Sequence, residues 1–123
     1  MKINKEPEIF LQSFELAKII LKSSLLLPKP TRYVLGRKLE EKILEFVLML
    51  NKIVGPSGIK FQNQQAKKEI LIELSYALDE FRILIRLSRE TGAYSAGLYE
   101  DLSERTLSIG RQIGGLIRAI KMP

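Results

Sequence analysis

Three clusters of proline and glycine divide a chain that otherwise repeats its apolar residues at spacings of three and four. The clusters lie at residues 28–30, 55–58 and 91–92. No segment alternates apolar and polar residues over more than a few positions, so the pattern does not predict strands. The sequence therefore predicts an all-α fold with four helices.

The expected helices cover residues 7–26, 31–53, 63–90 and 95 to the end of the chain. Thr31 and Ser95 are the predicted N-caps, and Thr91-Gly92 is a predicted C-terminal stop. The connections are short, which favours antiparallel neighbours, so we expect one up-down-up-down bundle over residues 1–123. The predicted core face of the first helix consists of Ile9, Phe10, Phe14, Ala17, Ile20, Leu21 and Leu25.

The chain contains no cysteine and no histidine among its 123 residues. It therefore lacks a thiolate nucleophile, an imidazole base, a disulfide framework and the usual ligands of zinc. We expect a protein that is not an enzyme and has no metal or cofactor. The first residues do not resemble a secretion signal, and no apolar run approaches the length of a membrane span, so the expected location is cytoplasmic.

Basic side chains outnumber acidic ones by 20 to 14, which gives a formal charge of +6 and favours an acidic partner such as RNA or DNA. The excess is concentrated between residues 16 and 39, where there is no Asp or Glu. Contacts to phosphate are one interpretation of this stretch, and a solvated surface is the other. Its basic residues are Lys18, Lys22, Lys29, Arg32, Arg37 and Lys38.

Further arginines repeat at helical spacing, with Arg82, Arg86 and Arg89 in the third helix and Arg111 and Arg118 in the fourth. Arginine presents a planar fork that matches phosphate oxygens, so such rows are candidate nucleic-acid contacts. The alternative is an ordinary surface on which nearby acids, such as Asp79 and Glu90, pair with the arginines.

Gly110, Gly114 and Gly115 lie inside the fourth predicted helix, where each costs about 0.5–1 kcal/mol relative to alanine. Gly110 and Gly114 share one face, which allows close approach of another helix. That helix belongs either to the same chain or to a second subunit. No phosphate-binding glycine motif surrounds these residues.

Two segments together resemble the Avd-like four-helix bundle family: LPKPTRYVLGRKLE at residues 27–40 and IGRQIGGLI at residues 109–117. LIRL at residues 84–87 fits between them in the expected order. The family includes the accessory variability determinant of diversity-generating retroelements and proteins encoded in intervening sequences of large-subunit ribosomal RNA genes. This chain has Leu116 where a bulky aromatic residue often follows the paired glycines.

The resemblance implies a basic homopentamer that binds nucleic acid and associates with a reverse transcriptase during mutagenic copying of template RNA. It offers no catalytic residues. Its matching segments contain Arg32, Arg37, Lys38, Arg86 and Arg111, and Arg118 follows directly. The leading hypothesis is thus a nucleic-acid-binding accessory protein, and the alternative is an intervening-sequence-type bundle that acts as a structural or protein-interaction scaffold.

Overall fold

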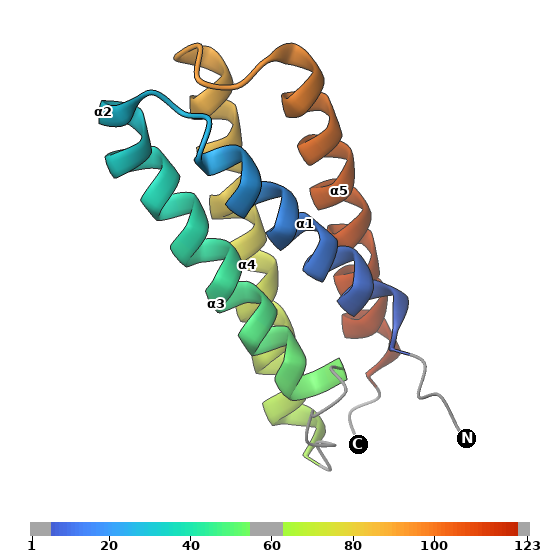
Figure 1. The fold of residues 1–123 in the computed structure, drawn as a ribbon. Coiled ribbons are helices and arrows are strands. Elements are labelled where there is room, and N and C mark those ends of the chain that lie inside the picture. Colours follow the sequence, from blue (N-terminus) through green and yellow to red (C-terminus); the bar gives the residue numbers. More distant parts are fainter. Residues whose placement is uncertain (1–5, 55–62, 121–123) are drawn as a thin grey trace, which may run out of the picture.

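The computed structural model describes residues 6–54 and 63–120, and this part of the chain is helical without a strand. Its four long helices are α1 (Glu8–Ser24), α3 (Arg37–Val54), α4 (Gln64–Glu90) and α5 (Ala96–Ala119). The all-α prediction is confirmed (Figure 1). The predicted loop at residues 55–58 lies outside the described residues.

Side-chain caps determine where the last two helices begin. The Asn63 side chain accepts hydrogen bonds from the amides of Gln65 and Ala66, and Ser95 Oγ accepts one from the amide of Leu98. Each cap satisfies backbone donors that the first helical turn leaves without partners. Helix α4 ends as predicted, because Gly92 adopts a φ of 84° directly after Thr91.

The second helix begins earlier than predicted, and Thr31 is not its N-cap. Pro28 precedes a helical turn, α2 (Lys29–Thr31), which continues through a π-helical turn, η1 (Arg32–Gly36), into α3. Pro30 is tolerated because an amide hydrogen in the first turn of a helix would have no intrahelical partner. The sequence-based expectation that residues 28–30 are non-helical is therefore wrong for Lys29 and Pro30.

Other predicted boundaries also shift, since α1 ends at Ser24 and α5 ends at Ala119. Part of the predicted core of α1 is wrong, because Phe14, Leu21 and Leu25 are exposed. They form one flank of the apolar stripe, whereas the buried face is centred on Ser13, Leu16 and Ile20. A wide apolar stripe does not reveal which of its edges meets the other helices.

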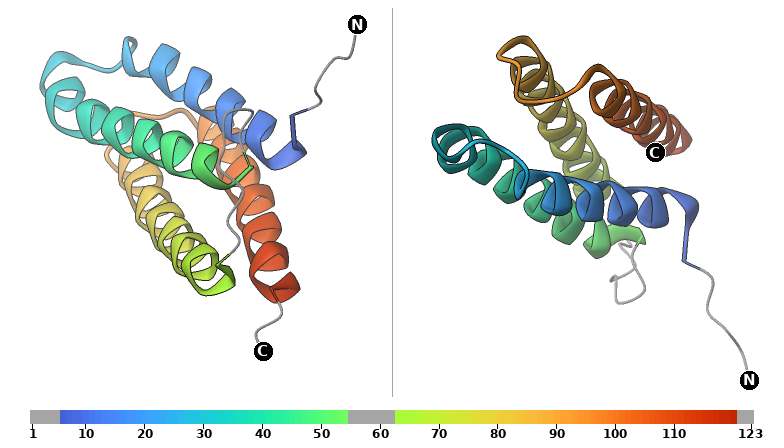
Figure 2. Two further views of the ribbon diagram at one scale, coloured as in Figure 1. Left: turned by 90° about the horizontal axis from the view of Figure 1, so that it is seen from below. Right: turned by 45° about the horizontal axis from the view of Figure 1, so that its top comes forward.

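The helices form two layers, with α1 beside α3 and α4 beside α5 (Figure 2). Contacts between α3 and α4 and between α1 and α5 join the layers. Leu16, Ile43, Leu74 and Ile109 contribute one fully buried side chain from each long helix to a shared apolar core. Burying each such side chain stabilises the fold by about 1.5–3 kcal/mol.

Tyr94 anchors the loop between α4 and α5 at one end of the bundle. Its side chain is buried, its amide donates a hydrogen bond to the Ser88 carbonyl, and its own carbonyl accepts one from Arg89 Nη1. Burial raises the pKa of Tyr94, and the nearby Ser23 hydroxyl partly opposes this effect. The Tyr94 hydroxyl nevertheless has no hydrogen bond of good geometry among the described residues.

No helix among residues 6–54 and 63–120 has both the length and the apolar character needed to cross a membrane.

Candidate nucleic-acid interface

Four of the predicted basic residues lie at one end of the bundle, in the helical turns that lead into α3 and in the first turn of α3 (Figure 1). They are Lys29 in α2, Arg32 in η1, and Arg37 and Lys38 in the first turn of α3. Lys29, Arg37 and Lys38 are exposed, and within the described chain none has an acidic side chain within 4.0 Å. We call Lys29, Arg32, Arg37 and Lys38 the basic end.

The π-helical turn sets the helical register between Arg32 and Arg37, and thereby the relative directions of the basic side chains. The Arg37 amide donates a hydrogen bond to the Arg32 carbonyl five residues earlier, which inserts one residue into the helical register. Gly36 is buried in this turn, where a Cβ atom would lie 2.8 Å from Ser24 Oγ. Arg32 is half-buried, and its Nε atom is buried without a hydrogen-bond partner among the described residues.

Lys18 and Lys22 lie on α1, and the absence of Asp and Glu from residues 16–39 does not leave Lys18 without an acidic partner, as the sequence suggested it would. Lys18 Nζ lies 2.8 Å from Glu15 Oε2, because the acid just outside the basic stretch is one helical turn away. The pKa of Glu15 is lowered mainly by the hydrogen bond from Lys18 and secondly by the positive charge of Lys18. Lys22 is exposed in the last turn of α1 and forms no ion pair within the described chain.

The remaining predicted contacts differ from the basic end in their pairing or their position along the bundle. Arg86 Nε donates a hydrogen bond of 2.6 Å to Glu90 Oε2, and this bond is the main reason why the pKa of Arg86 is raised. Helix α5 starts at the same end of the bundle as α2 and runs away from it, so that Arg118 in its last turn is remote (Figure 1). Arg111 is exposed two turns earlier.

The three glycines singled out in the sequence, Gly110, Gly114 and Gly115, have different neighbours in α5. A Cβ atom at Gly110 would lie 3.4 Å from Leu78 Cδ2 on α4, which is ordinary packing within the chain. At Gly114 and Gly115 the nearest atoms belong only to the Arg118 guanidinium, at 3.3 Å and 4.0 Å. Within the described residues, these two glycines therefore have no neighbouring helix within 4 Å of the Cβ position.

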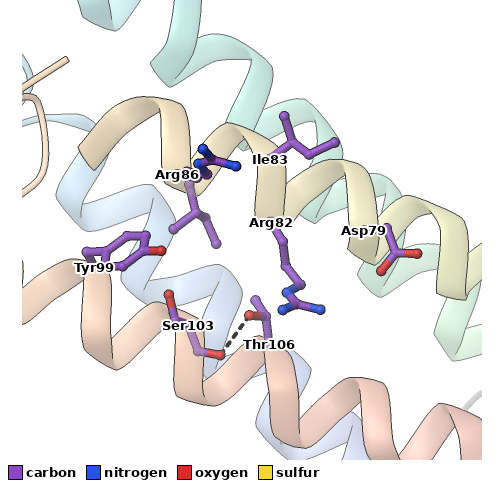
Figure 3. A pocket seen from close by; sticks show the side chains of 8 residues that line it. Asp79, Arg82, Ile83, Arg86, Tyr99, Ser103 and Thr106 are labelled. Carbon is purple, nitrogen blue, oxygen red and sulfur yellow. Dashed lines mark hydrogen bonds between the residues drawn. The ribbon is translucent and has the colours of Figure 1, made fainter. Parts of the chain in front are cut away.

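Sequence reasoning missed a hollow of about 380 Å³ between α4 and α5 (Figure 3). Arg82 and Arg86 line it from α4, while Tyr99, Ser103 and Thr106 line it from α5. The arginine row was visible in the sequence, but its polar partners depend on which face of α5 meets α4. A sequence signal was present, because spacings of four and three residues place Tyr99, Ser103 and Thr106 on one helix face.

No group of three or more acidic side chains capable of holding a metal ion occurs in residues 6–54 and 63–120. The chain matches no protein-family model, and no curated protein matches it.

Proposed function

We propose that the protein is a non-catalytic accessory protein of a diversity-generating retroelement, which binds RNA or DNA and a reverse transcriptase and assists mutagenic copying of template RNA. The observation that carries this proposal is the basic end, where exposed cations lie together without acidic partners in the described chain. Such cations attract phosphates and increase affinity without selecting a sequence.

Tyr33 supports contact with unpaired bases. It lies in η1 between Arg32 and Val34, and its side chain is 62% exposed, so it is not a core residue. Aromatic side chains beside cations stack on the bases of single strands, where each stacked base contributes about 1–3 kcal/mol. The basic end thus combines phosphate attraction with a surface for stacking.

The association with a reverse transcriptase and the homopentamer rest on the resemblance of residues 27–40 and 109–117 to the Avd-like family. We further propose one antiparallel up-down-up-down domain located in the cytoplasm. Short connections and the packing of α1 on α3, α3 on α4, and α4 on α5 support the antiparallel order. Exposed apolar side chains on α4, including Tyr76 and Ile83, support assembly with other chains.

The proposal is tested by measuring binding of the purified protein to structured RNA, single-stranded DNA and duplex DNA across a salt series. Light scattering on the same sample gives the mass of the assembly. We expect a defined oligomer that binds nucleic acid with an affinity that falls as salt increases. Absence of binding even at low salt contradicts the proposal.

A scaffold of the intervening-sequence type is the alternative, and the apolar surface of α4 that suits an oligomer also suits this role. Four exposed apolar residues lie along one face of α4 at spacings of four, seven and four residues: Ile72, Tyr76, Ile83 and Leu87. Apolar stripes of this kind bind other proteins. A purified protein that forms oligomers or captures a protein partner but never binds nucleic acid is the result expected for this alternative.

A further inference from the structure

A second hollow of about 250 Å³ adjoins the one between α4 and α5, and the two share Asp79, Arg82 and Thr106. We call the two adjoining hollows the α4–α5 groove. Arg86 lies in the first hollow, Arg111 in the second, and Arg82 in both. Asp79 is the single acid lining either hollow within the described chain.

We propose that the α4–α5 groove binds a nucleoside phosphate, with Arg82 as the main ligand of the phosphate. The ligand is either a free nucleotide or one nucleotide of a single-stranded nucleic acid. Binding of a strand rests on the function proposed above. This site is separate from the basic end and supplies recognition of an individual nucleotide that surface cations alone do not.

Arg82 has the geometry and the freedom to hold an anion. Its side chain extends from α4 across the hollow toward Thr106 on α5 (Figure 3). Within the described residues it forms no ion pair and no hydrogen bond, although Asp79 lines the same hollow. A guanidinium group can donate two parallel hydrogen bonds to one phosphate, which makes Arg82 a better anion ligand than Arg86, whose Nε is bonded to Glu90.

The other polar groups suit a sugar and its phosphate. The hydroxyls of Tyr99 and Ser103 donate no hydrogen bond within the described chain, and both residues line the first hollow, where Tyr99 lies on the side of Arg86 (Figure 3). They can donate to phosphate oxygens, whereas the Asp79 carboxylate can accept a hydrogen bond from a sugar hydroxyl. Arg111 adds positive charge in the adjoining hollow.

The size of the groove favours one nucleotide unit over a duplex. Pockets for small ligands have volumes of about 300–1,000 Å³, and the larger hollow falls within this range. A double helix presents its phosphates on a rigid convex surface, so it cannot place a nucleoside in a hollow of this size. A single strand or a free nucleotide can do so.

The experiment follows backbone amide signals by NMR while the full chain is titrated with four probes: uridine monophosphate, inorganic phosphate, a single-stranded oligonucleotide and a duplex. The key variant is Arg82→Gln. Arg105→Gln is the matched control, because Arg105 is also on this half of the bundle but pairs with Asp101 outside the groove.

We expect uridine monophosphate to shift the amides of Arg82, Ser103 and Thr106. Arg82→Gln should weaken this binding about tenfold, since it removes a charged hydrogen-bond donor, and Arg105→Gln should leave it unchanged. Shifts at the same amides with the single strand identify the strand as a source of the ligand. Shifts with uridine monophosphate alone identify the free nucleotide.

Groove amides that do not shift with any probe overturn the inference, as does equal weakening by the two variants. Inorganic phosphate that binds as tightly as uridine monophosphate overturns the nucleoside part. If the strand binds but shifts only residues 29–38, the proposed function stands and the groove site fails. If uridine monophosphate shifts the groove while no nucleic acid binds, the groove site stands and the proposed function fails.

Discussion

Ser24 Oγ, at the end of α1, lies 2.8 Å from the position that a Cβ atom would occupy at Gly36. The same hydroxyl donates a hydrogen bond of 3.1 Å to Glu40 Oε1 on α3. Leu27 Cδ1 approaches the same position to 3.2 Å. Gly36 thus allows the end of α1 to pack directly against the π-helical turn that contains Arg32 and joins the two other parts of the basic end.

Gly36→Ala should therefore destabilise the protein by about 1–3 kcal/mol, the usual effect of inserting an atom into a packed site. Urea denaturation followed by circular dichroism measures this change. The matched control is Gly97→Ala on α5, where a Cβ atom meets nothing within 4 Å and stability should be equal or higher. Equal stability of the two variants would show that the turn does not need a glycine.

The Tyr94 hydroxyl should make the protein sensitive to alkaline pH. Burial raises the pKa of Tyr94 above its ordinary value of 10.0, so the unfolded chain releases this proton first. The contribution of Tyr94 to stability is constant below pH 10.0 and falls as the pH rises from there toward the folded-state pKa. Stability falls most steeply with pH where the hydroxyl is ionised in the unfolded chain but still protonated in the folded one.

Tyr94→Phe removes this proton, and the hydroxyl has no hydrogen-bond partner of good geometry to lose. The free energy of unfolding of the variant should stay close to that of the wild type at neutral pH and exceed it increasingly above pH 10.0. Denaturant titrations at several pH values compare the two proteins. Parallel stability curves would mean that Tyr94 titrates equally in both states.

Substitution of Gly114 distinguishes a role in packing within the chain from a role in packing between subunits. Because only the flexible end of Arg118 lies near its Cβ position, Gly114→Ala should increase the stability of the single chain by about 0.5–1 kcal/mol. If the glycine face meets a second subunit, the same change should lower the mass measured by light scattering. An unchanged oligomer would assign Gly114 no part in a subunit interface.

The sequence predicted the fold well where a signal is local. Ser95 caps α5 and Gly92 ends α4 as predicted, because caps and stops depend on neighbouring residues. The third helix begins at the predicted position, although the role of Asn63 as its cap was not predicted. Thr31 failed as an N-cap because a proline can also occupy the first turn of a helix, and the sequence alone does not decide between the two starts.

Predictions that depend on tertiary structure were less complete. Tyr94 lies in a loop outside any periodic segment, so no pattern marks it as a core residue. The opposite error occurred at Leu25, which continues the helical spacing of α1 but is 70% exposed. The basic stretch was evident from composition, whereas the pairing of Lys18 with Glu15 required attention to the residue just beyond its edge.

The most direct test of the account is the salt dependence of RNA binding by a variant of the basic end. The triple change Lys29→Gln, Arg37→Gln and Lys38→Gln removes three exposed cations that have no acidic partner in the described chain. Arg32 is retained because it is half-buried. The charge-matched control changes Lys52, Lys67 and Lys68 to Gln, near the end of α3 and the start of α4.

The account predicts that the basic-end variant keeps its helical content and binds single-stranded RNA more weakly. Its plot of log affinity against log salt concentration should have a slope that is less negative by about 2. The control should bind with nearly the wild-type slope. Identical binding and slopes for the wild type and the basic-end variant would contradict the claim that this end of the bundle contacts nucleic acid.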